Sequence, residues 1–259
     1  MSQPTIVFVP GAFHTPEYYN PVRALLEAKG YGTEAVSLPS VGNTSASPMT
    51  DDVTAIRAVT SRLADEGHQV VLVMHSYGGI PGTESAKELG CGLRRKAGKT
   101  GGIVALVYLA AYFLKKGMSH SFIHLPFYFA GSVRGFKANT HIVQDGLIFH
   151  DKPAALETLY NDFTPEMDPK GWASRLQTQS AASWAGELSY ESYRDIPTTY
   201  LLCTRDRAIP IDIQRNFVGF AEGHISTVTC EAGHSPMISM PEVVIDVIIR
   251  AAEALQGEE

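Results

Sequence analysis

The chain has 259 residues, of which 44% are hydrophobic and 19% charged. This balance is typical of a folded globular protein and excludes disordered and collagen-like chains. The 21 basic and 27 acidic residues give a formal net charge of −6, which disfavours a nucleic-acid partner. No apolar run approaches the roughly 20 residues that span a bilayer, so no membrane association is predicted either.

The cysteines and the N-terminal residues indicate the compartment. Cys91, Cys203 and Cys230 are odd in number and far apart, and residues 1–5 lack the basic and apolar regions of a signal peptide. We therefore expect free thiols and a cytoplasmic location. The sequence has no C-x-x-C, no H-E-x-x-H and no G-x-G-x-x-G after a strand, so neither a metal nor a nucleotide cofactor is predicted.

The first half of the chain alternates between strand and helix patterns. Its first strand is β-branched and closed by Pro10-Gly11, as is typical of a buried parallel strand. The second helix carries Asp51 and Asp52 in its first turn, where acids favour the helix dipole. Strands are expected at 5–9, 33–38, 69–74 and 103–109, and helices from about residue 16 to Gly30, from Thr50 to near Gly67, and directly after the third strand.

The alternation breaks after Tyr112 and resumes after Pro197. The block between them holds aromatic residues, histidines and helix-like patches at 153–160 and 171–179, but no strongly β-branched strand. Beyond it, strands are expected at 198–203 and 225–230, and helices at 211–220 and 241–255.

This order predicts an α/β fold with a doubly wound, mostly parallel sheet of about six strands. Residues 1–111 and 196–259 would form the core, and residues 112–195 a helical lid inserted into it.

A serine stands at the turn between the third strand and the helix that follows. Such a turn holds the serine in a strained backbone conformation and exposes its hydroxyl above the sheet. Gly78 provides the small residue needed after the serine, whereas Met74 occupies the position where glycine is usual. Because the turn directly follows a buried strand, we interpret Ser76 as a nucleophile rather than only a helix N-cap. The run reads Met74-His75-Ser76-Tyr77-Gly78-Gly79.

A serine nucleophile needs a base and a group that orients the base. On this type of sheet the expected chain order is serine, acid, histidine. Asp206 follows the strand at 198–203, and His234 follows the strand at 225–230, so both lie at the carboxyl ends of parallel strands. We therefore predict a catalytic triad of Ser76, Asp206 and His234. Asp212 is the rival acid, but it is better placed to begin the next helix.

Acyl transfer also requires donors for the developing oxyanion. The backbone N–H groups of Tyr77 and Ala12 are the candidates, because the first lies at a helix N-terminus and the second in the loop after the first strand. An aromatic-rich insertion over the serine suggests a largely apolar pocket, for which we name His14, Phe113 and Trp184. The other aromatic residues noted in the insertion are Phe122, Phe127, Tyr128, Phe129 and Trp172.

Together these motifs resemble the α/β-hydrolase fold superfamily, over nearly the whole chain. They are most similar to its short esterase and hydroxynitrile-lyase-like branch, which includes plant methyl-ester hydrolases. The resemblance implies the same triad and the same two oxyanion donors. Lyase members of the branch carry a lysine after the catalytic histidine and a threonine in the first loop. Ser235 and Gly11 stand at those positions, which argues against cyanohydrin cleavage.

The sequence therefore predicts a cofactor-free carboxylic ester hydrolase that forms an acyl-enzyme on Ser76. Its partner would be a small, largely apolar ester, lactone or thioester. Two alternatives stay open: a non-hydrolytic lyase, acyltransferase or cyclase of small-molecule biosynthesis on the same scaffold, and a ligand-binding protein without turnover. The identity of the substrate and the oligomeric state, a homodimer included, are also left open.

Overall fold

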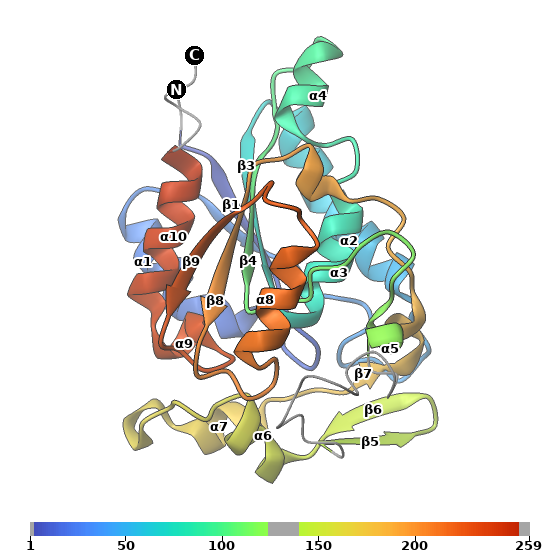
Figure 1. Ribbon diagram of the computed structural model, residues 1–259, viewed down its shortest axis with the longest axis vertical. Coiled ribbons are helices and arrows are strands. Elements are labelled where there is room, and N and C mark those ends of the chain that lie inside the picture. Colours follow the sequence, from blue (N-terminus) through green and yellow to red (C-terminus); the bar gives the residue numbers. More distant parts are fainter. Residues whose placement is uncertain (1–2, 124–139, 254–259) are drawn as a thin grey trace.

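A parallel sheet forms the centre of the molecule. The computed structural model describes residues 3–123 and 140–253 (Figure 1). Within these ranges, six strands are arranged in the order β2-β1-β3-β4-β8-β9, and every neighbouring pair is parallel. The predicted fold class is thereby confirmed. The strands are β1 (Thr5–Val9), β2 (Thr33–Ala35), β3 (Gln69–His75), β4 (Gly102–Leu109), β8 (Thr198–Cys203) and β9 (Ser226–Cys230).

The expected helices of the core begin and end close to the predicted residues, whereas the short helices Cys91–Lys96 and Pro236–Ser239 were not predicted. The first expected helix is divided into a 3-10 turn and an α-helix, because Pro16 and Pro21 both stand at helix starts. The helices of the core are η1 (Pro16–Tyr19), α1 (Asn20–Ala28), α2 (Met49–Asp65), η2 (Ser76–Gly78), α3 (Gly79–Ser85), α4 (Cys91–Lys96), α8 (Ile211–Gly219), α9 (Pro236–Ser239) and α10 (Pro241–Glu253).

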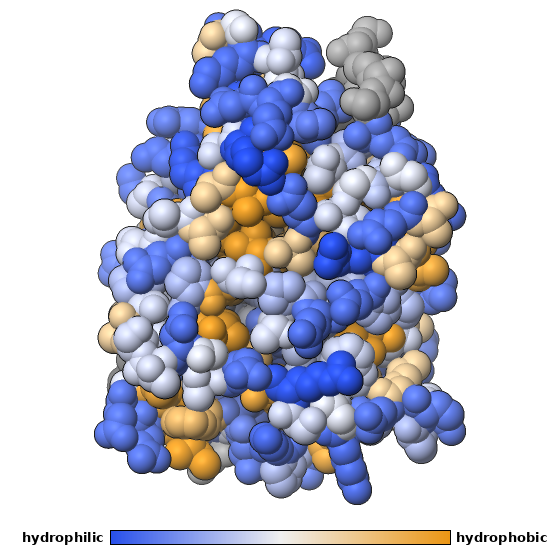
Figure 2. Space-filling model, turned by 180° about the vertical axis from the view of Figure 1, so that it is seen from behind, coloured by the Kyte–Doolittle hydropathy of each residue, from blue (hydrophilic) through white to orange (hydrophobic). Residues whose placement is uncertain are grey.

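The sheet is covered on both faces, because successive side chains of a strand point to opposite sides. On β1, Ile6 and Phe8 belong to the apolar layer that contains α1 and α10. Val7 and Val9 belong to the layer that contains α2 and α8. Figure 2 shows the hydrophobic residues on one outer face in several separate groups, divided by hydrophilic side chains.

The chain between β4 and β8, here called the β4–β8 segment, departs from the expectation of a helical insertion. Three of its strands form an antiparallel sheet in the order β5-β6-β7. Figure 1 shows this sheet with α6 and α7 at one end of the molecule. The division into a core and a lid remains a prediction. The elements are α5 (His120–Ile123), β5 (His141–Gln144), β6 (Leu147–His150), α6 (Lys152–Thr158), η3 (Pro165–Met167), α7 (Pro169–Ser174), β7 (Gln179–Ser180), η4 (Ala181–Ala185) and η5 (Ser192–Arg194).

Candidate active site

Ser76 stands at a sharp turn directly after β3. Its φ is +50°, a region that non-glycine residues rarely adopt and that often marks a functional turn. The turn brings the following helix close to β1: a Cβ atom at Gly78 would lie 2.3 Å from the carbonyl oxygen of Pro10. Only glycine fits there, so the backbone approach that the sequence predicted after the serine is present.

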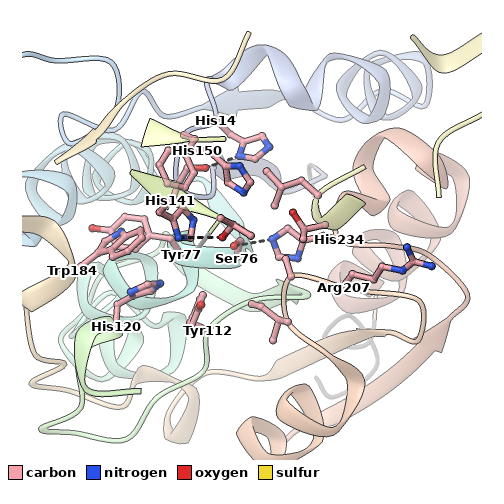
Figure 3. Close-up of a pocket in the computed structure, with 17 residues that line it drawn as sticks. His14, Ser76, Tyr77, Tyr112, His120, His141, His150, Trp184, Arg207 and His234 are labelled. Atoms are coloured by element: carbon pink, nitrogen blue, oxygen red, sulfur yellow. Dashed lines mark hydrogen bonds between the residues drawn. The ribbon is translucent and has the colours of Figure 1, made fainter. Parts of the chain in front are cut away.

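Three side chains from separate strand ends form one hydrogen-bonded chain. Figure 3 shows two of them, Ser76 and His234, with the hydrogen bond between them. Nε2 of His234 lies 3.0 Å from Oγ of Ser76, and Nδ1 of His234 lies 2.8 Å from Oδ2 of Asp206. Because a carboxylate only accepts, Nδ1 carries the proton, and the lone pair of Nε2 faces the serine hydroxyl. The structure thus brings together the three residues that the sequence selected.

The carboxylate of Asp206 is held by its own loop and by α8. Its Oδ1 accepts hydrogen bonds from the backbone N–H groups of Ala208 and Ile209, at 2.8 and 2.9 Å. Its Oδ2 also accepts one from Nε2 of Gln214 at 3.2 Å. These donors keep the carboxylate oriented toward the imidazole of His234. The rival acid, Asp212, instead lies in the first turn of α8.

Two further contacts hold the backbone around His234. Nε2 of the buried His75 donates to the carbonyl oxygen of His234 at 2.8 Å, which agrees with a structural role for that neighbour of the serine. From the β4–β8 segment, Oδ2 of Asp162 accepts the N–H of Gly233 at 2.6 Å. The adjacent Asn161 donates from Nδ2 to the carbonyl oxygen of Arg205 at 2.9 Å. These two side chains therefore hold the residues that precede His234 and Asp206.

The loop after β1 and the turn after β3 are connected by a buried polar network. Asp52 was expected only to favour a helix N-terminus, but it is fully buried. Its Oδ2 accepts hydrogen bonds from the hydroxyls of Tyr77 (2.7 Å) and Ser40 (2.6 Å). Gln179 donates to Ser40 Oγ at 2.8 Å and accepts the N–H of Phe13 at 3.4 Å. Burial raises the pKa of Asp52.

A cavity of about 270 Å³ opens beside the Ser76 hydroxyl. Ala12 and Tyr77, whose N–H groups are the candidate oxyanion donors, both line it. His14 and Trp184 line it as expected. The cavity is also lined by Phe13, Tyr112, His120, Thr140, His141, His150, Thr158, Leu159, Arg207, Ala208 and Ile209.

The expectation for Phe113 requires correction. This residue is fully buried, and its ring centroid lies 4.1 Å from that of Tyr193 and 4.9 Å from that of Tyr108. It therefore packs in the core, while the preceding Tyr112 lines the cavity. Trp172 packs against Tyr18, with ring centroids 5.0 Å apart. The side chains of Phe122, Phe127, Tyr128 and Phe129 lie outside the described part of the structure.

Two histidines of the β5–β6 hairpin line the cavity, although the sequence did not predict them there. His141 and His150 are directly opposite each other across its two strands, and both line the cavity. The sequence feature that indicates the hairpin is the dipeptide Asp145-Gly146. In the structure both residues have a positive φ, +51° and +76°. This dipeptide between two short strands is the strongest local sign of a tight hairpin.

Burial keeps several histidines around the site neutral. It lowers the pKa of His14 to about 3, against a backbone hydrogen bond from Nδ1 to Ala12 that raises it. It lowers the pKa of His75 well below its ordinary value, and it also lowers the pKa of His150. Neutral imidazoles carry one donor and one acceptor nitrogen each, so these groups offer hydrogen bonds rather than charge.

Three general properties of the chain bear on the site. In the described ranges, no group of three or more histidine, cysteine or acidic side chains could hold a metal ion. The three cysteines are free, and the sulfurs of Cys203 and Cys230 lie 3.8 Å apart. None of the helices in the described part of the chain combines the length and hydrophobicity that a membrane crossing needs.

Comparison with known proteins assigns the chain to a family. Residues 6–247 match the alpha/beta hydrolase family. The alpha/beta hydrolase nvfD of Aspergillus novofumigatus is 34% identical, over 99% of this chain and 100% of that protein. Methylesterase 1 of Arabidopsis thaliana is 26% identical, over 95% of each chain. The crystal structure of a pyrethroid hydrolase from Sphingobium faniae is 25% identical, with a TM-score of 0.74 over 97% of this chain and 98% of that one. The protein belongs to the alpha/beta hydrolase family.

Proposed function

We propose that this protein is a serine hydrolase that cleaves a small, largely apolar carboxylic ester, lactone or thioester. The observation that carries the proposal is the hydrogen-bonded chain from Ser76 through His234 to Asp206, with distances of 3.0 and 2.8 Å. A serine hydroxyl is a weak nucleophile unless a base accepts its proton, and this chain supplies the base together with the group that orients it.

In the proposed mechanism, Ser76 Oγ attacks the substrate carbonyl while Nε2 of His234 takes the hydroxyl proton. His234 then gives that proton to the leaving alcohol, thiol or lactone oxygen, and an acyl-enzyme remains on Ser76. A water molecule next loses a proton to Nε2 of His234 and attacks the acyl carbon. The bond between that carbon and Ser76 Oγ then breaks, His234 returns the proton to the serine oxygen, and the acid is released. Asp206 keeps the imidazole in the required tautomer and stabilises its cationic form.

The negative charge on the carbonyl oxygen needs donors during both steps. The N–H of Tyr77, at the start of the helix after the serine, and the N–H of Ala12, in the loop after β1, are the proposed donors. One such donor typically contributes about 3 kcal/mol to the transition state. The Asp52 network supports this assignment, because it holds the Tyr77 side chain and the backbone of Phe13, next to Ala12.

An ester as substrate class is supported by the relatives, two of which are named a methylesterase and a pyrethroid hydrolase. The lining of the cavity supports a largely apolar substrate, because Phe13, Tyr112, Leu159 and Trp184 contribute to it. Its volume of about 270 Å³ suits a small molecule.

The test is the replacement Ser76→Ala, assayed with p-nitrophenyl acetate and with a fluorophosphonate probe. We expect the wild type to be labelled on Ser76, and the variant to lose labelling and at least about a thousandfold in kcat. Equal labelling of the two proteins would contradict the proposal. In isotopically labelled water, one labelled oxygen should enter the acid product, which separates hydrolysis from acyl transfer to another acceptor.

A further inference from the structure

One side chain of the cavity wall offers a hydrogen-bond acceptor that the described protein leaves unused. His150, at the end of β6, has its Nδ1 2.9 Å from the carbonyl oxygen of Asp151. A carbonyl only accepts, so Nδ1 carries the proton and Nε2 carries a lone pair. Among the described residues, none donates a hydrogen bond to this Nε2. The imidazole lines the cavity next to Ser76, and Figure 3 shows it on the same side of the serine as His14.

A second group on the same wall has the same polarity. The hydroxyl of Thr158, at the end of α6, donates to the carbonyl oxygen of Ala154 at 2.8 Å. Its proton is thereby committed to the helix backbone, and the oxygen can only accept from the cavity. Thr158 and His150 are both buried and both line the cavity. The β4–β8 segment thus contributes two acceptors from neighbouring elements.

His14 has the same tautomer as His150, but the protein supplies a hydrogen-bond donor to its Nε2. Its Nδ1 donates to the carbonyl oxygen of Ala12 at 2.6 Å, so its Nε2 is an acceptor in the same way. That nitrogen receives the hydroxyl of Tyr160 at 3.1 Å. The two imidazoles have equivalent tautomers, but only the one at position 14 has a donor from the described chain.

His150 is uncharged, so its Nε2 remains a hydrogen-bond acceptor. Burial lowers the pKa of His150 and outweighs the hydrogen bond to Asp151, which raises it, and His234 lowers it further. The ring of His150 also contacts Phe13 edge-on at 5.4 Å and His141 at 5.0 Å between centroids. The imidazole is therefore neutral near pH 7, and its orientation is fixed by packing as well as by the Asp151 carbonyl.

We propose that the substrate carries a hydroxyl group on its non-reacting part, and that this hydroxyl donates to Nε2 of His150 when the ester carbonyl is at Ser76. The proposal rests on the ester hydrolysis proposed above. A substrate without the donor would displace water from His150 and leave a buried acceptor unpaired, which costs binding free energy. Sites of this kind reject analogues that lack the hydroxyl more strongly than apolar pockets reject a missing methylene.

The experiment compares three matched esters on two scaffolds, methyl benzoate and phenyl acetate. Each scaffold is tested unsubstituted, with a hydroxyl, and with a methoxy group at the meta or para position. The methoxy group keeps the oxygen but removes the donor. Each kcat/KM value is divided by the rate of alkaline hydrolysis of the same ester, which removes intrinsic reactivity. For the preferred isomer, we expect a hydroxyl-to-methoxy ratio of about ten or more in the wild type.

Two substitutions at the site and one outside it complete the test. His150→Phe should bring the ratio close to one, whereas His150→Gln should keep part of it, because an amide oxygen still accepts. His68→Gln, at an exposed position away from the cavity, should keep the wild-type ratio. The inference would be overturned if the wild type hydrolysed the hydroxyl and methoxy esters equally well, or if His150→Phe kept the wild-type ratio. Either result would leave ester hydrolysis intact. Absence of hydrolysis and of labelling at Ser76 would instead remove the proposed function.

Discussion

At the scale of single residues, Met74 shows how the turn around the serine tolerates an unusual neighbour. Glycine is usual two positions before such a serine, but here a long side chain stands there and is fully buried. The space comes from Gly82 on α3, where a Cβ atom would lie 2.5 Å from Sδ and 2.7 Å from Cγ of Met74. The small residue that lets β3 and α3 pack closely is therefore Gly82 on the helix, and not a glycine at position 74 on the strand.

The contact between Met74 and Gly82 predicts that the effect of Gly82→Ala on the free energy of unfolding changes sign when Met74 is replaced by alanine. Gly82→Ala in the wild type should lower the free energy of unfolding by about 1 kcal/mol, because overpacking outweighs the helix preference of alanine. In a Met74→Ala background the clash is gone, and the same substitution should raise stability by about 0.5–1 kcal/mol. Urea unfolding of the four proteins measures the cycle. Additive effects would show that the two side chains do not compete for this space.

The residues of the site could largely be selected from the sequence, for a physical reason. In a parallel sheet, every strand ends at the same edge, so polar residues directly after buried strands converge there. Ser76, Asp206 and His234 all obey this rule. Phe113 falls outside this rule, because it lies beyond the end of β4 in a stretch without regular secondary structure. There Tyr112 lines the cavity and Phe113 packs in the core.

At the scale of elements, the β4–β8 segment is joined to the loops after β8 and β9. Asn161 holds the carbonyl of Arg205, and Asp162 holds the N–H of Gly233. Each of these backbone groups belongs to the residue directly before a member of the proposed triad. A shift of the segment would therefore alter the distance between the imidazole and its partners.

We expect Asp162→Ala to lower kcat/KM about tenfold or more, because it removes a hydrogen bond from a charged acceptor, which typically contributes about 1.5–3 kcal/mol. Asp162→Asn should retain most activity, since the amide oxygen can still accept the N–H of Gly233. The measurement is steady-state hydrolysis of p-nitrophenyl acetate.

The matched control is Asp168→Ala, which removes a helix cap in the same segment. Asp168 accepts the N–H of Gly171 at 3.0 Å, and no hydrogen bond or ion pair joins it to the triad loops in the described ranges. Its loss should cost about 1 kcal/mol of stability without changing kcat/KM. If both alanine variants lose activity equally, the effect of Asp162 is general destabilisation rather than positioning.

The two kinds of sheet in this protein differ in how clearly their strands can be predicted from the sequence. The four central strands of the parallel sheet, β1, β3, β4 and β8, are buried and rich in apolar residues, so they are easily predicted. β5 and β6 have four residues each, and all four side chains of β5 are exposed. β5 therefore has no burial pattern, and in β6 only Ile148 and His150 are buried. The turn at Asp145-Gly146 is the clearer sign of the two strands. Without the hairpin, the placement of His141 and His150 at the cavity could not be predicted.

At the scale of the whole molecule, buried neutral histidines couple stability to pH. Burial lowers the pKa of His14 from 6.5 to about 3, and the pKa values of His75 and His150 are lowered in the same direction. In the unfolded chain these groups take up protons below pH 6.5, whereas in the folded chain they do not. Their contribution is thus fully present above pH 6.5 and is lost as the pH falls, over the range from 6.5 to about 3 for His14.

We expect His14 alone to lower the free energy of unfolding by about 1.4 kcal/mol per pH unit below its unfolded pKa of 6.5. His75 and His150 should make this slope steeper. Urea unfolding at several values between pH 5 and 8 measures this slope. His14→Gln should reduce it by the equivalent of one proton. An unchanged slope in that variant would mean that His14 is already protonated in the folded protein.

The cavity is assembled from two sources, the ends of the parallel strands and the β4–β8 segment, and this has a consequence for how such proteins diversify. The residues of the proposed triad belong to the first source, and the acceptors at His150 and Thr158 to the second. Exchanging the segment between relatives should redirect selectivity while the bond-breaking chemistry carries over. A functional chimaera must, however, keep the hydrogen bonds of Asn161 and Asp162 to the backbone of Arg205 and Gly233. Without them, the exchanged segment would shift His234 relative to Ser76.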